Sequence, residues 1–146
     1  MVLKDLISDY GELKKYRKNN RFYITVDPTL IREITGKLVK EYKDGVYISS
    51  ITPVDLIKEG VIEVNYEFQI LPEKTFLVVK TRIPRDKSEI DSIVDILPGA
   101  KVLEQEAYDL MGVYFRGNPY LRKPFLLPEH MAQETPLRKD WKPSRG

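Results

Sequence analysis

The chain contains no cysteine and a single histidine, His130. Without cysteine there are no disulfides, no thiolate zinc sites, no iron–sulfur ligands and no cysteine nucleophile. One histidine leaves little for a histidine-built metal site or a Ser-His-Asp relay. The sequence also has no glycine-rich phosphate loop, no G-x-S-x-G elbow and no H-E-x-x-H pair. We therefore expect no catalytic, cofactor-binding or metal-binding residues in this chain.

Two further features are weak or missing: overall charge and long apolar runs. The formal net charge is only +2, so no strong field attracts the whole chain to nucleic acid. No apolar run approaches the ~18 to 20 residues that cross a bilayer, and residues 1–20 hold no secretory core. These absences predict a soluble intracellular protein.

The sequence contains enough apolar residues for one folded domain, and its charges are distributed unevenly along the chain. The 146 residues are 42% apolar, which is enough for a hydrophobic core. Residues 1–111 carry 17 Lys/Arg against 19 Asp/Glu, whereas residues 112–146 carry seven against three and hold five of the ten prolines. We therefore predict a folded domain over residues 1–112, followed by an extended, basic, Pro-rich C-terminal arm over residues 113–146. The large apolar side chains of this arm indicate that it docks on a partner protein.

The first half of the domain is predicted from its hydrophobic periods. A helical stripe indicates a first helix over residues 3–17, and residues 21–26 form a short β-rich run. Asp27 and Pro28 supply the cap and first turn of a second helix, and a strand follows over residues 46–52. The buried stripe of the second helix comprises Ile31, Ile34, Leu38, Val39 and Tyr42.

The second half contains the clearest strand pattern. Residues 61–70 alternate strictly between apolar and polar, and they pair with residues 75–83 as a hairpin. The segment Asp86-Lys-Ser-Glu89 has the spacing of a capping box, which predicts a helix carrying Ile90, Ile93, Val94 and Leu97. A last helix is expected over residues 100–111, closed by Gly112. The sequence thus predicts an α+β fold: a two-layer domain with a mostly antiparallel sheet and flanking helices, plus the extended arm.

Three carboxylates, Glu104, Glu106 and Asp109, are close together on the last predicted helix. Glu106 and Asp109 lie three residues apart and could share a helix face. One interpretation is a free-standing enzyme in which these two act with Arg122 or Arg138. A second is a nucleic-acid-binding protein that uses the basic arm. A third is that the carboxylates anchor the arm and the partner of the arm.

The same helix begins a two-part signature that resembles the 30-kDa subunit family of respiratory complex I, whose bacterial members belong to NADH:quinone oxidoreductase. The first part runs from Leu103 to Lys123 and the second from Thr135 to Trp141. Gln105 and Asn118 stand where the family has arginine and histidine, which suits the divergent archaeal branch of membrane-bound hydrogenases and sulfur-reducing complexes. The resemblance implies that the following residues contact the partner: Glu104, Glu106, Asp109, Gly112, Phe115, Pro119, Leu121, Arg122, Pro136, Leu137, Arg138, Lys139 and Asp140.

The resemblance also implies a role, a location and partners. Members of this family are non-catalytic peripheral-arm subunits of membrane-bound, ion-pumping redox complexes, on the cytoplasmic side of the cell membrane. They pack on a hydrogenase-like large catalytic subunit, with iron–sulfur subunits nearby and no nucleic acid. The iron–sulfur clusters, and in some complexes a nickel–iron centre, lie in those partner subunits. Within the signature, Arg138 either folds back to pair with a helix carboxylate or faces the large subunit, and we expect the second.

Overall fold

The computed structural model describes residues 2–17 and 20–143. Its centre is a five-stranded sheet with the order β1-β2-β5-β4-β3. The strands span Lys14–Lys15 (β1), Arg21–Thr25 (β2), Val46–Leu56 (β3), Val61–Ile70 (β4) and Thr75–Pro84 (β5). All neighbours are antiparallel except β2 and β5, which run parallel. The mostly antiparallel α+β fold predicted from the sequence is confirmed.

The predicted hairpin is confirmed, and its strands β4 and β5 lie inside the sheet. Val61 pairs with Pro84 and Ile70 with Thr75, without an interruption. The alternating pattern of β4 directs Ile62, Val64, Tyr66 and Phe68 into the core, where all four are fully buried. The helical residues expected to face them are also fully buried: Ile34, Leu38, Ile90 and Ile93.

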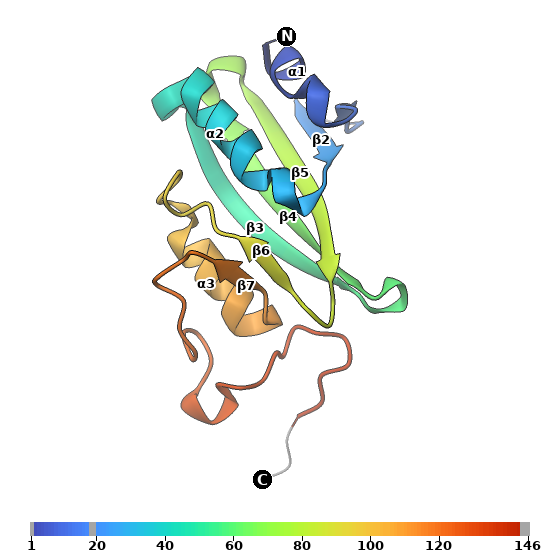
Figure 1. Cartoon of the computed structure of the whole chain (residues 1–146), viewed down its shortest axis with the longest axis vertical. Helices are drawn as coiled ribbons and strands as arrows, with labels where there is room; N and C mark the ends of the chain where they lie inside the picture. Colours follow the sequence, from blue (N-terminus) through green and yellow to red (C-terminus); the bar gives the residue numbers. More distant parts are fainter. Residues whose placement is uncertain (1, 18–19, 144–146) are drawn as a thin grey trace.

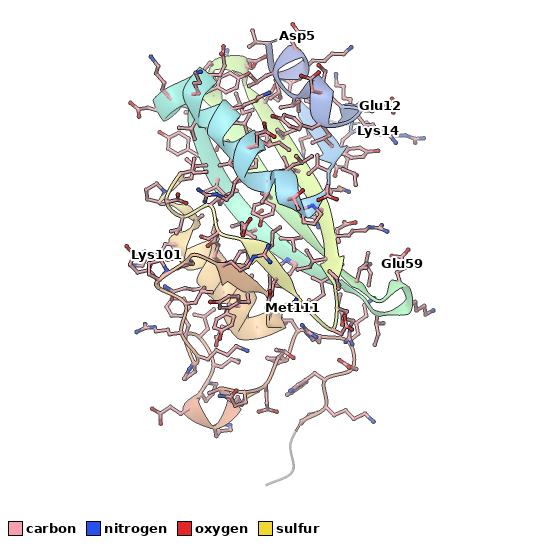
Figure 2. All side chains as sticks on the ribbon, viewed as in Figure 1. Asp5, Glu12, Lys14, Glu59, Lys101 and Met111 are labelled. Atoms are coloured by element: carbon pink, nitrogen blue, oxygen red, sulfur yellow. The ribbon has the colours of Figure 1, made fainter. Side chains whose placement is uncertain are left out.

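Two helices were predicted correctly, and Figure 1 shows them on the same face of the sheet. Helix α2 (Ile31–Tyr42) follows a 3₁₀ turn over Pro28–Leu30, and the Asp27 side chain accepts hydrogen bonds from the Thr29 amide and hydroxyl. Helix α3 (Ala100–Met111) ends at Gly112, whose φ of 75° is left-handed. Figure 2 shows Lys101 and Met111 at opposite ends of α3.

The predicted helix over residues 3–17 is wrong beyond its first turns. Helix α1 covers only Val2–Ile7, and a 3₁₀ turn over Ser8–Tyr10 follows it. Glycine at position 11 has low helix propensity, and the chain after it turns to run along β2. There Lys14 pairs with Tyr23 and Lys15 with Phe22, so that sheet pairing replaces the expected helical turns.

The helix predicted from the capping-box spacing is also wrong. Glu89–Asp91 forms strand β6, which pairs in parallel with β7 (Tyr114–Arg116). The Ser88 hydroxyl donates to the backbone oxygens of Pro84 and Arg85, which ties the turn before β6 to the end of β5. The C-terminal arm thus begins with a strand that is part of the folded body, and Figure 1 shows residues 117–143 of the arm passing beneath α3.

Candidate partner interface

Helix α3 carries the start of the signature, and its C-terminal end sets the path of the arm. A Cβ atom added at Gly112 would lie 2.9 Å from Thr135 Cγ2 and 3.4 Å from Arg138 Nη2, while the positive φ already disfavours other residues. Glycine is therefore required at position 112 for two reasons: the helix ends there in a left-handed conformation, and the arm passes too close for a side chain.

Glu104 lies inside the molecule and joins three segments of the chain. Its Oε1 accepts hydrogen bonds from the Ser92 hydroxyl at 2.6 Å and from the Asn118 side-chain amide at 2.8 Å. Its Oε2 accepts from the Ile93 amide at 3.0 Å. Burial raises the pKa of this carboxyl, and the three hydrogen bonds only partly oppose that shift. Glu104 thus fixes the β6–α3 connection and the turn after β7.

Asp109, one turn further along α3, holds the middle of the arm. Its two carboxylate oxygens accept backbone N–H bonds from Phe125 at 3.1 Å, Leu126 at 2.7 Å and Leu127 at 3.0 Å. Asp109 is fully buried, so these three bonds satisfy a carboxylate that has little access to water. The sequence interpretation that the helix carboxylates anchor the arm is consistent with this geometry.

Arg138 folds back on the body, but its acceptors differ from the helix carboxylate considered from the sequence. Its Nε donates to the Met111 backbone oxygen at 2.7 Å, and its two terminal nitrogens donate at 3.2 Å to the Arg85 oxygen and to Ser88 Oγ. A cation that caps the last carbonyls of a helix is favourable because those groups lack intrahelical partners. Arg138 is therefore an internal contact of this chain, which contradicts the expectation that its side chain faces the large subunit.

Beside Arg138, the end of the arm contacts an ion pair of the folded body. This ion pair was not predicted from the sequence. Arg85 donates to Asp55 through two nitrogens, at 2.7 and 2.9 Å, and one of these also reaches Asp140 at 2.6 Å. The backbone N–H of Lys139 completes the set by donating to Asp55 at 2.8 Å. Hydrogen bonding to Arg85 lowers the pKa of Asp55 and of Asp140. We call Asp55, Arg85, Arg138 and Asp140 the clasp.

One signal for the clasp was present in the sequence. Asp55 follows Ile51 by four residues in β3, so strand alternation places both on the core face, where both are buried. A carboxylate on the core face needs a cation or several donors. Its partner Arg85 is 30 residues away and gives no local signal.

The predicted contact residues divide into two groups. Glu104, Asp109 and Phe115 are fully buried, and Arg138 is largely used inside the chain. Glu106, Gly112, Leu121 and Pro136 are partly exposed, and the others are exposed: Pro119, Arg122, Leu137, Lys139 and Asp140. The partner interface stays a prediction, and it now depends on the exposed and partly exposed group.

The part of the chain that the structure describes contains no cluster of three metal-ligating side chains. Within the same residues, no helix has the length and hydropathy to cross a bilayer.

Comparison with known proteins decides the family. Residues 24–145 match the family model described as the 30-kDa subunit of respiratory-chain NADH dehydrogenase. The chain belongs to this family. It is 36% identical over 110 residues to a subunit of the F(420)H(2) dehydrogenase of Methanosarcina mazei, a match that covers 73% of this chain and 69% of the relative. The resemblance inferred from the signature is therefore confirmed.

Two solved structures extend the comparison. A chain of the membrane-bound sulfane sulfur reductase, an archaeal respiratory membrane complex, matches with a TM-score of 0.84 and 32% identity, over 97% of this chain and 84% of that chain. The trypsin-resistant fragment 1–134 of Nqo5 matches with a TM-score of 0.65 over 81% of this chain and 95% of that chain. At 19% identity the second match shows the fold alone. This 30-kDa-family chain is thus similar to subunits of multi-subunit membrane redox complexes.

Proposed function

We propose that this chain is a non-catalytic peripheral subunit of a membrane-bound, ion-pumping redox complex, and that it docks through its C-terminal arm on a hydrogenase-like large catalytic subunit. It would lie on the cytoplasmic side of the membrane, beside iron–sulfur subunits. The iron–sulfur clusters, and in a hydrogenase-type complex a nickel–iron centre, would reside in those partners. The family membership and the composition of the arm support this proposal.

The main support for the proposal is that large apolar side chains remain exposed on an arm whose backbone is anchored to the body. Asp109 and the clasp fix the backbone of the arm, yet Tyr120, Leu126 and Leu137 remain 47%, 56% and 59% exposed. Apolar groups presented on a pre-positioned segment suit a protein–protein interface, because little conformational entropy is lost when they become covered.

The names of the relatives support a structural role. They refer to complexes with different substrates: NADH, F(420)H(2) and sulfane sulfur. A subunit found with all three is better explained by a common assembly task than by binding one of these substrates.

Neither alternative function gains support from the geometry. The carboxylate of Asp109 is occupied by three backbone amides, and no hydrogen bond joins it to Glu106 in the described residues. Of the two arginines proposed for such an enzyme, Arg138 is engaged by the Met111 carbonyl. This engagement also removes one of the cations that a nucleic-acid-binding arm would offer.

The proposal is tested by purifying an affinity-tagged chain from native membranes. We expect the wild-type chain to bring down a hydrogenase-like large subunit with iron–sulfur subunits. The double variant Leu126→Asp/Leu137→Asp should melt like the wild type but lose these partners, because charges replace the exposed apolar contacts. Leu71→Asp is the matched control, since Leu71 is 45% exposed in the β4–β5 turn at the opposite end of the molecule. Equal recovery of partners by both variants would contradict docking through the arm.

A further inference from the structure

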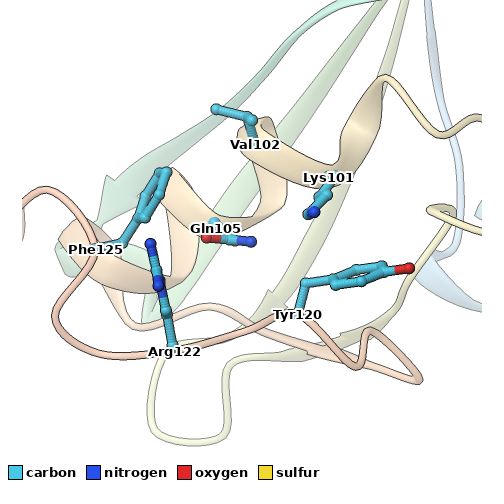
Figure 3. A pocket seen from close by; sticks show the side chains of 6 residues that line it. All are labelled: Lys101, Val102, Gln105, Tyr120, Arg122 and Phe125. Atoms are coloured by element: carbon cyan, nitrogen blue, oxygen red, sulfur yellow. The ribbon is translucent and has the colours of Figure 1, made fainter.

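A cavity of about 350 Å³ lies between helix α3 and the arm, and neither the buried carboxylates nor the clasp contributes to it. Figure 3 shows Lys101, Val102 and Gln105 of α3 on one side and side chains of the arm on the other. We call this cavity the Gln105 socket. It is lined by Lys101, Val102, Gln105, Tyr120, Arg122 and Phe125.

The floor of the socket contains a buried polar group without a partner. Gln105 is only 5% exposed, and its Oε1 accepts no hydrogen bond from residues 2–17 or 20–143. In Figure 3 its amide nitrogen is directed into the socket, on the side of Lys101 and Tyr120. A carboxylate cannot donate to that oxygen, so what the socket offers to an acidic group is the N–H groups of the same amide, which face the cavity.

The walls of the socket carry positive charge that this chain does not neutralise. Lys101 Nζ lies 4.2 Å from the centroid of the Tyr120 ring, and the Arg122 guanidinium carbon lies 5.3 Å from that of Phe125. Among the described residues no carboxylate forms an ion pair with Lys101 or Arg122, and none lines the socket. The aromatic rings therefore hold two cations around an amide, with room between them.

We propose that the Gln105 socket receives an aspartate or glutamate side chain from another subunit of the complex. The carboxylate accepts from the Gln105 amide N–H and from the cations of Lys101 and Arg122, and its aliphatic stem packs between Tyr120 and Phe125. Charge-assisted bonds to a carboxylate from several donors are stronger than neutral ones. The inference rests on the proposed function, and it names the chemistry of one contact in that interface.

The first test is chemical and uses the intact complex from native membranes. A carbodiimide joins an amine to a carboxylate only when the two are in contact. We expect peptide mapping to find Lys101 linked to an aspartate or glutamate of another subunit. Lys74, exposed in the β4–β5 turn, should show no such link, and Lys101→Arg should remove the link while the chain stays in the complex. A link from Lys101 to a carboxylate of this same chain would overturn the proposal.

The second test separates binding from folding. Gln105→Leu replaces the unpaired amide with an apolar group of similar size, so the isolated chain should melt at the same temperature or higher. In the complex, we expect retention of this variant during a salt wash to fall about tenfold. Lys101→Glu/Arg122→Glu should lower retention further. Leu71→Ser, a neutral change at an exposed residue outside the socket, is the control and should be retained like the wild type.

The results distinguish the two proposals. If the wild-type chain co-purifies with the complex while Gln105→Leu and the charge-reversal variant are retained equally well, the socket assignment is wrong and the proposed function stands. If the wild-type chain does not co-purify at all, both fail.

Discussion

Substitution of Glu104 by alanine is expected to cause the largest loss of stability of any single change in the signature. The variant leaves three donors without their acceptor: the Ser92 hydroxyl, the Ile93 amide and the Asn118 side chain. Each unsatisfied buried donor costs about 1 to 3 kcal/mol, so the free energy of unfolding should fall by about 3 to 5 kcal/mol. For a domain of this size the corresponding drop in melting temperature is roughly 10 °C or more.

Thermal and urea unfolding of the isolated chain measure this effect. Glu106→Ala is the control on the same helix, because Glu106 is partly exposed and no hydrogen bond of its side chain occurs in the described residues. It should change the free energy of unfolding by less than about 0.5 kcal/mol. Glu104→Gln should lie between the two, since it keeps one acceptor oxygen. A melting temperature of Glu104→Ala within about 2 °C of wild type would refute the internal role of Glu104.

The second large effect is expected at Asp109 and concerns the arm. Asp109→Ala removes the acceptor of three consecutive amides, those of Phe125, Leu126 and Leu127. We expect the hydrogen exchange of these amides to accelerate by at least about tenfold, because the segment then opens locally without unfolding the sheet. Trypsin should also cut faster after Arg122, whereas the bond after Lys123 precedes Pro124 and resists trypsin.

Hydrogen exchange measured residue by residue in the isolated chain distinguishes local opening of the arm from a loss of stability of the whole domain. The amides of β4 and β5 should exchange as slowly as in the wild type after correction for any change in global stability. Glu106→Ala again serves as the control and should leave the arm protected. Unchanged exchange at residues 125–127 in Asp109→Ala would mean that the arm is held by other contacts.

The parts of the fold that were predictable are those with strong local patterns. The strict alternation of β4 identified the core face, and the apolar stripe together with Gly112 identified α3. The segment Asp86-Lys-Ser-Glu89 failed because a capping box contributes only about 1 kcal/mol, and Ile90 is fully buried by pairing with Phe115 in β7, 25 residues later. The non-local pairing of β6 with β7 therefore stabilises this segment more than a local helix cap would.

In the candidate interface, too, local sequence features were predictable and contacts between distant residues were not. The signature singled out Glu104, Asp109 and Arg138 as contacts of a partner, whereas the structure shows each of them bonded to other segments of this chain. The acceptors and donors are mostly backbone groups, such as the Met111 carbonyl and the Leu126 amide, and these carry no side-chain identity in a sequence. A partner 30 or more residues away, as Arg85 is from Asp55, is likewise invisible without the fold.

We expect the arm, held on the body by Asp109 and the clasp, to be the docking surface for another subunit. The most direct measurement places a photo-reactive amino acid at Leu126, Leu137 or Leu71 in separate variants of the tagged chain, and irradiates each complex in native membranes. We predict cross-links from positions 126 and 137 to a larger subunit, and none from position 71. Cross-links from positions 126 and 137 only to this chain or to lipid, in complexes that contain it, would contradict the claim.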